Sequence, residues 1–237
     1  MSFADNLAAI QQRIHAACSR AGRDNQSVML LAVSKTQAAE AIDEAVRSGQ
    51  FLFGENKVQE AKAKIPSSLG RARWHLIGHL QSNKAREAVG LFEMIHSVDS
   101  LERAREISKR CEQASKEMPV LLEVNVAGES SKFGYKPERV LAELKELNLL
   151  PRIALQGLMT IPPFATDSEK SRPHFRQLRE LKGQCEEILG SPLRHLSMGM
   201  SGDFEIAIEE GSTIVRIGTA LFGPRKPRVT ASAQGDV

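Results

Sequence analysis

Lys35 is the residue whose type and position most directly suggest chemistry, because it follows the apolar run from Val28 to Val33. The run is too short for a helix and has the composition of a strand buried on both faces. A lysine at the carboxyl end of such a strand has its stem in a low dielectric, and burial lowers the pKa of a lysine. A neutral amine can attack an aldehyde and form a Schiff base. From position alone, a lysine that marks the exit of a strand into solvent is the commoner case.

Two loops near the end of the sequence suit an anion. Ser201-Gly202-Asp203 precedes a short helical segment, and Gly218-Thr219 opens the last one. The first N–H groups of a helix are unpaired and attract phosphate. An ordinary N-cap at Ser201 and an ordinary turn at Gly218 remain the alternatives.

Arg216 interrupts the apolar strand from Ile214 to Ile217. If Val215 pointed outward, the alternation of a strand would turn Arg216 inward. A buried guanidinium needs a partner. That partner is either a carboxylate of the core, such as Glu123, or a bound ligand.

Strand-like and helix-like segments alternate along the 237 residues, after one extra helix at the N-terminus. Such alternation predicts a parallel sheet, and eight units predict a closed (β/α)8 TIM barrel. A doubly wound sheet is the alternative, but the first loop, Ser34 to Gln37, lacks the glycines of a phosphate loop. We expect one barrel domain over residues 1–237, with a flexible tail at about 224–237. The expected strands lie at Val28–Val33, Phe51–Gly54, Trp74–Gly78, Met94–Ser97, Val120–Val126, Ile153–Leu158, Arg194–Met198 and Ile214–Ile217.

The composition excludes several classes of function. A net charge of +3, with one Trp and one Tyr, gives no basic or aromatic surface typical of nucleic-acid binding. No apolar stretch approaches the roughly 18 residues of a membrane span, and no signal peptide is evident. The histidines lack metal-ligand spacing. The odd set Cys18, Cys111 and Cys185 shows no CxxC spacing, so we expect buried thiols in a reducing, cytoplasmic compartment.

Several motifs resemble those of the pyridoxal phosphate homeostasis protein family, the single-domain relatives of the alanine racemase N-terminal barrel. The similarity runs from about Leu30 to Gly223. The motifs are Leu31–Thr36, Phe53–Asn56, Trp74–Lys84, Gly157–Ile161, Leu196–Ser201 and Val215–Thr219.

This resemblance implies that Lys35 carries pyridoxal 5′-phosphate (PLP) as a Schiff base. It implies that Arg216 faces the pyridine nitrogen of the cofactor. It also implies an accessory role for Lys132, although Phe133 departs from the small or aliphatic residue usual in the family. The remaining cofactor-binding residues that it implies are Ser197, Ser201, Gly218 and Thr219 around the phosphate, and Asn56 and His79 around the cofactor.

The same residues predict weak catalysis. An arginine beside the pyridine nitrogen disfavours its protonation, which reduces the ability of PLP to stabilise a carbanion. The related racemases take a tyrosine from a second domain as the opposite base. We expect that domain to be absent here, and Tyr135 does not match the role.

Three functions follow as hypotheses. The first is a carrier that holds and supplies PLP in the cytoplasm with little or no turnover, as a monomer, to PLP-dependent apoenzymes. The second is an amino-acid racemase or another PLP enzyme with a single base. The third is a class I aldolase, in which Lys35 reacts with the substrate and no cofactor is present.

Overall fold

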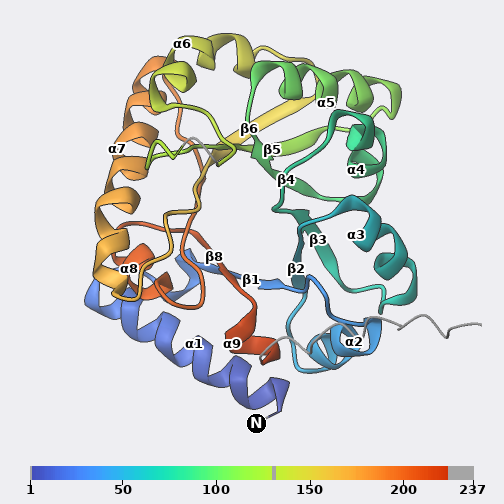
Figure 1. The fold of residues 1–237 in the computed structure, drawn as a ribbon, viewed down its shortest axis with the longest axis vertical. Helices are drawn as coiled ribbons and strands as arrows, with labels where there is room; N and C mark the ends of the chain where they lie inside the picture. Colours follow the sequence, from blue (N-terminus) through green and yellow to red (C-terminus); the bar gives the residue numbers. More distant parts are fainter. Residues whose placement is uncertain (1, 130–131, 224–237) are drawn as a thin grey trace, which may run out of the picture.

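The computed structural model describes residues 2–129 and 132–223, and the predicted tail at about 224–237 lies outside them. In this part of the chain, eight parallel strands close into a barrel in sequence order, as the pattern predicted. Figure 1 looks along the barrel and shows the helices arranged around it. The strands are β1 (Met29–Val33), β2 (Leu52–Glu55), β3 (Arg73–Leu76), β4 (Met94–Val98), β5 (Met118–Glu123), β6 (Ile153–Met159), β7 (His195–Ser197) and β8 (Ile214–Ile217).

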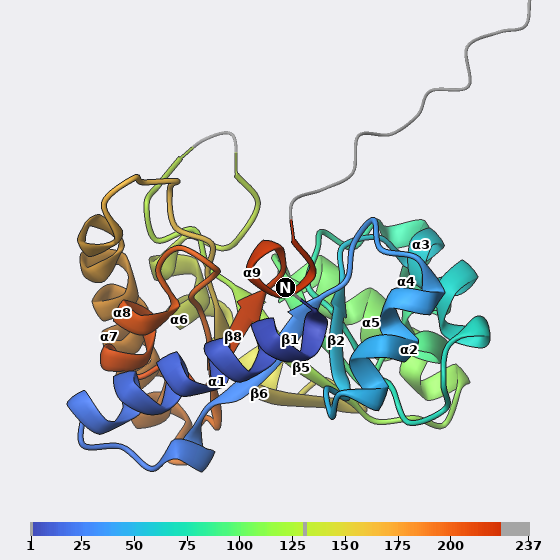
Figure 2. The ribbon, with the colours of Figure 1, turned by 90° about the horizontal axis from the view of Figure 1, so that it is seen from below.

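The helices follow the strands, apart from the extra N-terminal helix α1, which crosses the outside of the barrel near β1 and β8 (Figure 2). The α-helices of the described chain are α1 (Phe3–Arg20), α2 (Ala39–Arg47), α3 (Val58–Lys64), α4 (Ala85–Leu91), α5 (Leu101–Gln113), α6 (Pro137–Asn148), α7 (Arg172–Leu189), α8 (Phe204–Glu209) and α9 (Thr219–Phe222). The 3-10 turns are η1 (Asn25–Ser27), η2 (Ile65–Ser67), η3 (Ser82–Lys84) and η4 (Ser168–Ser171).

Local signals set several helix boundaries. The Ser100 hydroxyl accepts the N–H of Arg103 at 3.2 Å and caps α5, because the first N–H groups of a helix have no partner within it. Pro137 begins α6, where its missing N–H is harmless. After α1, Gly22 takes a left-handed conformation with φ of 63°, which glycine adopts without a steric penalty.

The strand β5 differs from its prediction by starting earlier, at Met118, and by ending at Glu123. Pro119 pairs with Ala154 of β6, while pairing with β4 starts only at Val120. A proline is tolerated where its missing N–H would face no partner strand. Apolar periodicity could not show this, because it carries no information on which neighbouring strand pairs where.

Two apolar layers result from the alternation of side chains along each strand. The outer and larger layer packs the strands against the helices, and it includes Val215 and Ile217 of β8. The inner layer fills the barrel and includes Ile214, Leu31 and Leu121. The thiols of Cys18, Cys111 and Cys185 are buried, as expected.

Candidate functional site

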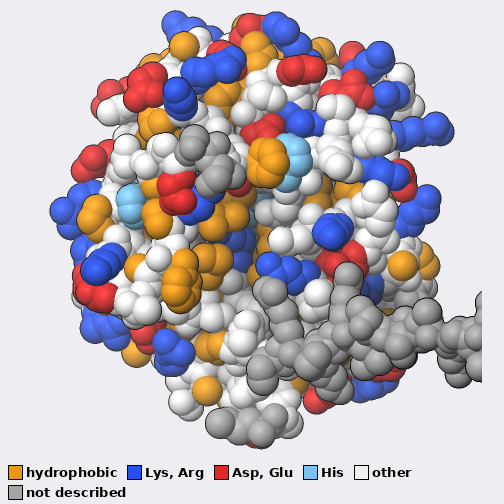
Figure 3. Space-filling model, in the orientation of Figure 1, with side chains coloured by type: hydrophobic (Ala, Val, Ile, Leu, Met, Phe, Trp, Pro, Cys, Tyr) orange, Lys and Arg blue, Asp and Glu red, His pale blue; other side chains and the backbone are white. Residues whose placement is uncertain are grey.

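A cavity of about 390 Å³ opens where strands β1 and β8 end, and Lys35 lines it. The loop after β7 and the start of α9 form other walls. Figure 3 shows this face of the molecule hollowed near its centre, with basic side chains in and beside the hollow. The cavity has the size of a small-molecule site, on the order of 300–1,000 Å³. Of the residues predicted for the site, those that line the cavity are Lys35, Ser201, Arg216, Gly218 and Thr219.

Arg216 lies within the barrel wall, as the alternation of β8 predicted, and its side chain is 4% exposed. It donates hydrogen bonds to the Ser197 hydroxyl at 2.7 Å and to the Thr160 carbonyl at 2.8 Å. Burial lowers the pKa of Arg216 to about 10, so the side chain stays charged at neutral pH. Within the described residues, the hydrogen-bond partners of the guanidinium are thus a hydroxyl and a carbonyl, and Glu123 acts on it through its charge.

Ser197 is fully buried on β7 and belongs to a chain of polar groups across the barrel. Its hydroxyl lies 3.0 Å from Nδ1 of His96, and Nε2 of His96 lies 3.0 Å from Nδ1 of His75. Burial lowers the pKa of His75 to about 3 and that of His96 well below its usual value. Both rings are therefore neutral at pH 7. Ser197 does not line the cavity, and its direct contact is with Arg216.

Asp203 shapes the loop that carries Ser201. Its carboxylate accepts the N–H of Met200 at 2.7 Å and the hydroxyl of Ser171 at 3.0 Å. These bonds fold the loop back on the start of α8. Asp203 also lines the cavity, where its charge raises the pKa of Arg216 against the effect of burial.

The second wall for an anion is the turn from β8 into α9. Gly218 precedes this helix, and its carbonyl oxygen accepts the N–H of Leu221 at 2.9 Å, so the first-turn N–H groups left for a ligand are those of Thr219 and Ala220. A Cβ atom on Gly218 would lie 3.3 Å from the carbonyl oxygen of Val33, so a larger residue would crowd β1 just before Lys35.

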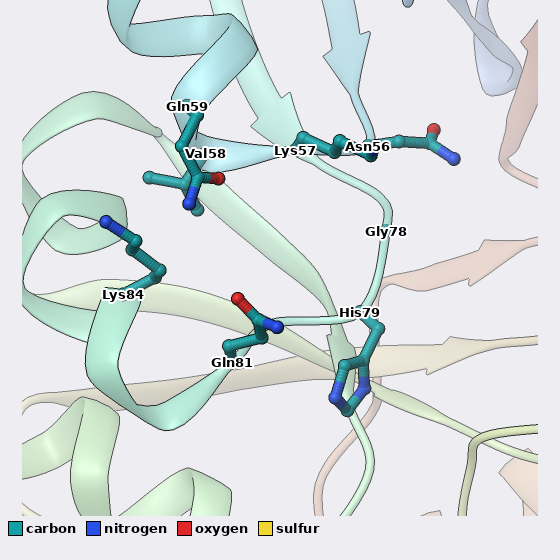
Figure 4. A pocket seen from close by; sticks show the side chains of 8 residues that line it. All are labelled: Asn56, Lys57, Val58, Gln59, Gly78, His79, Gln81 and Lys84. Carbon is teal, nitrogen blue, oxygen red and sulfur yellow. The ribbon is translucent and has the colours of Figure 1, made fainter.

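Asn56 and His79 line a separate pocket of about 570 Å³ between the loops after β2 and β3. In Figure 4, Gln59 and Lys84 lie on the helical side of this pocket and the Asn56 amide points away from them. The two loops are in close contact, since a Cβ atom on Gly78 would lie 2.3 Å from the Asn56 carbonyl oxygen. The eight predicted residues thus lie in three places. Five line the cavity, Asn56 and His79 line this neighbouring pocket, and Ser197 is buried in the core.

His79 has close neighbours on two sides. Its ring stacks on Phe133, with centroids 3.8 Å apart, and its Nδ1 lies 3.0 Å from a carboxylate oxygen of Asp99. The departure from the family at Phe133 therefore supplies the stacking partner of a predicted site residue. The amine of Lys132 pairs with Glu129 at 2.7 Å.

Glu123, at the end of β5, has an unusual charge environment. Its pKa is raised to about 7, mainly by burial and also by the negative charge of Asp99, while the positive charge of Arg216 lowers it. The carboxyl group is 8% exposed. With this pKa, the charge of Glu123 changes near neutral pH.

The donors around the cavity fit a ligand with both an aldehyde and a phosphate. An amine for the aldehyde comes from Lys35, and hydroxyls for a phosphate come from Ser201 and Thr219. Arg216, fixed by two hydrogen bonds, can donate to a ring nitrogen that is itself unprotonated. No group of three or more His, Cys, Asp or Glu residues in the described chain could hold a metal ion.

Several residues that hold the predicted ones in place could not be identified from sequence patterns. They are His75, His96 and Thr160 beside Arg216, and Lys64 with Glu55 beside Lys35. A carboxylate at the end of an apolar strand, Glu55, was the available signal, since a buried carboxylate requires a donor. The sequence offered no indication of which cation that would be.

The fold and the site together define a class: a (β/α)8 barrel with a lysine-centred cavity for an anionic ligand at the carboxyl ends of its strands. The profile of the family described as alanine racemase, N-terminal domain, matches residues 6–226. A pyridoxal phosphate homeostasis protein of Aquifex aeolicus is 47% identical over 95% of this chain and all of the relative. The chain belongs to the pyridoxal phosphate homeostasis protein family, within the wider alanine racemase N-terminal domain family.

Solved structures support the same family assignment. The structure of PipY from Synechococcus elongatus without PLP is 38% identical, with a TM-score of 0.84, over 94% of this chain and all of that chain. A second PipY structure, with PLP bound, has a TM-score of 0.83 at the same identity. An alanine racemase of Clostridium difficile is 15% identical, with a TM-score of 0.73, over 92% of this chain and 56% of its own, and shares the fold. Within residues 2–129 and 132–223, no helix is long and apolar enough to cross a lipid bilayer.

Proposed function

We propose that this protein binds pyridoxal 5′-phosphate as a Schiff base on Lys35 and holds, buffers or supplies it, with little or no turnover. The observation that carries the proposal is the convergence of Lys35, Ser201, Arg216 and Thr219 on one cavity. The PLP-bound PipY structure and the names of the curated relatives support the same ligand.

The proposed contacts divide by chemistry. Ser201 and the Gly218-Thr219 turn bind the phosphate, and Arg216 donates to the pyridine nitrogen. Ser197 acts through Arg216, because its hydroxyl accepts a hydrogen bond from the guanidinium at 2.7 Å. Asn56 and His79 line the neighbouring pocket and contact the outer side of the cofactor.

Arg216 also accounts for weak catalysis. PLP supplies an electron sink, which is strongest when its ring nitrogen is protonated. A guanidinium that stays charged at neutral pH disfavours a second positive charge beside it. Holding PLP for transfer requires only reversible reaction with Lys35.

We propose further that the protein acts as a monomer in the cytoplasm and that PLP-dependent apoenzymes receive the cofactor. The three buried free thiols are consistent with a reducing compartment. We also propose that residues 1–237 form one barrel domain with a C-terminal tail.

The test is to titrate the purified protein with PLP, record the visible spectrum, reduce with borohydride and map the labelled peptide. We expect a pyridoxyl group on Lys35 and none in Lys35→Ala. Lys109→Ala, which alters an exposed lysine on α5, is the matched control and is expected to label normally. A colourless, unlabelled wild-type protein would contradict PLP binding. Rapid racemisation of any L-amino acid in a panel would favour the enzyme alternative over the carrier.

A further inference from the structure

A buried ion cluster lies beside Lys35. Lys64, in the last turn of α3, is only 6% exposed. Its amine donates to the carbonyl oxygen of Ser34 at 2.7 Å, to Glu55 at 2.6 Å and to Glu60 at 3.2 Å. All three protons of the ammonium group are thus used. One of them goes to the backbone of the residue directly before Lys35.

The two carboxylates of the cluster also bind next to Lys35. Glu55 accepts the hydroxyl of Ser34 at 2.6 Å, and Glu60 accepts the backbone N–H of Thr36. The N–H of Ser34 donates in turn to the carbonyl of Gly54 at 3.1 Å. The backbone is therefore tied to β2 and α3 on both sides of Lys35.

Thr36 shows that this arrangement is imposed by the surroundings. Its φ is 67°, in the left-handed region that β-branched residues rarely occupy. Backbone strain of this kind persists only where neighbouring contacts determine the conformation, and it is concentrated at functional sites. Two contacts fix it here: the N–H of Thr36 donates to Glu60, and the N–H of Gln37 closes a turn onto the Ser34 carbonyl at 3.0 Å.

Stability alone is a weak reason for such a cluster. A buried ion pair can often be replaced by apolar residues without loss, because removing charges from water offsets their attraction. Glu55 is fully buried, and burial raises its pKa despite Lys64. The cluster is better explained by what it fixes, which is the direction in which Lys35 leaves the backbone.

We propose that Glu55, Glu60 and Lys64 are positioning residues that hold the backbone at residues 34–36 so that the Lys35 amine points into the cavity. None of the three lines that cavity in the described chain, so they act through Lys35. This inference rests on the proposed function only in that its first test uses PLP as the aldehyde. In the reaction, the amine adds to the aldehyde carbon, a C=N bond forms and the carbonyl oxygen leaves as water. Borohydride then delivers hydride to that carbon, and water supplies the proton.

The test compares Lys64→Met with Lys62→Met. Lys62 lies on the same helix but is exposed, and its amine pairs with Glu87 at 3.0 Å. Small displacements of a reacting group slow reactions by up to roughly a hundredfold. We therefore expect Lys64→Met to slow the labelling of Lys35 by PLP and borohydride about tenfold or more. Lys62→Met should react at the wild-type rate.

A second ligand separates positioning from loss of the site. Pyridoxine 5′-phosphate has the phosphate and ring of PLP but no aldehyde, so it cannot react with Lys35. We expect Lys64→Met to bind it as the wild type does, because the phosphate and ring contacts lie outside the cluster. Equal weakening of both ligands would indicate collapse of the cavity and would overturn the proposal.

The double variant Glu55→Gln/Lys64→Met covers the case in which Lys64→Met does not fold, because it leaves no unpaired buried carboxylate at Glu55. It still lacks the bond to the Ser34 carbonyl, so slow labelling is again expected. Wild-type rates in a folded variant, checked by circular dichroism, would refute the inference. If the wild type does not react with PLP, the proposed function fails. Reductive methylation of Lys35 by formaldehyde then tests the positioning without the cofactor.

Discussion

The two buried polar networks next to the cavity differ in charge and in what they hold. The network beside Lys35 is ionic: Lys64 pairs with Glu55 and Glu60, and the bonds end on the backbone of Ser34 and Thr36. The network beside Arg216 joins one cation to neutral groups, Ser197, His96 and His75.

The difference follows from the position of each network in the fold. The ionic network lies between a barrel strand and α3, where carboxylates from two elements reach one amine. The other crosses the barrel interior between β4 and β7, which are not neighbours in the sheet. A second charge there would be penalised by burial, so the histidines stay neutral. The ionic network can therefore fix the backbone beside Lys35. The other network can fix the Arg216 side chain without neutralising its charge.

The largest effect is expected from removing one member of the ionic network. Lys64→Met leaves Glu55 buried without its cation, and breaking a buried pair in this way costs about 3–5 kcal/mol. The free energy of unfolding, measured with urea, should fall by that amount. Lys62→Met removes an exposed pair worth less than about 1 kcal/mol. Similar losses of unfolding free energy in both variants would show that the buried cluster contributes no more to stability than an exposed ion pair.

Ser197→Ala tests the neutral network. The substitution removes the hydroxyl that accepts a hydrogen bond from Arg216 and that also lies next to His96. A hydrogen bond to a charged group contributes about 1.5–3 kcal/mol to the free energy of unfolding. Stability should fall by that amount, and affinity for pyridoxine 5′-phosphate should fall with it because the guanidinium loses a support. Ser48→Ala, at an exposed helix end, is the control. Unchanged affinity would mean that Thr160 alone fixes Arg216.

The dependence of stability on pH should differ in sign between the buried histidines and the buried carboxylate Glu123. The pKa of His75 is about 3 in the folded chain against 6.5 for an ordinary histidine, so between these values the unfolded chain binds more protons and stability falls as pH falls. His96 acts in the same direction. His96→Gln should make stability less sensitive to acid between pH 6.5 and 4.5, by up to about 1.4 kcal/mol per pH unit. The exposed His15→Gln is the control.

Glu123 gives the opposite sign. Its pKa is about 7 when folded against 4.5 ordinarily, so in this range the folded chain binds more protons and stability rises as pH falls. Glu123→Gln should therefore make the protein more sensitive to acid between pH 7 and 4.5. Thermal unfolding measured at half-unit steps of pH checks both signs, and equal slopes in the two variants would contradict the assignment.

The smallest effect is expected at Thr36. Thr36→Gly relieves a left-handed conformation that disfavours a β-branched residue by about 1–2 kcal/mol, while glycine loses roughly 0.5–1 kcal/mol more entropy on folding. The net result should be a gain between zero and about 1.5 kcal/mol in stability, measured with urea. Labelling of Lys35 should nevertheless slow down, because the restraint is weaker. A stability loss would show that the Thr36 side chain contributes contacts of its own.

Most of the fold could be predicted from the sequence because its signals are local. Each strand was located by a short apolar run, and the order of strands and helices left few topologies other than a barrel. Errors were confined to strand ends such as Met118, where pairing partners decide the boundary. The inward direction of Arg216 was also predictable, because alternation along a strand is a local property.

The sequence alone determined that one group of residues would lie within or just after neighbouring strands of a barrel, since strands and their loops can be recognised along the chain. These residues are Lys35, Ser201, Arg216, Gly218 and Thr219. Only the tertiary structure decided which groups support them. The bond from Lys64 to the Ser34 carbonyl joins residues 30 positions apart, and that between Ser197 and His96 joins residues 101 apart. Such contacts depend on how the barrel closes and on the side-chain directions at each helix end, and no periodicity in the sequence records them.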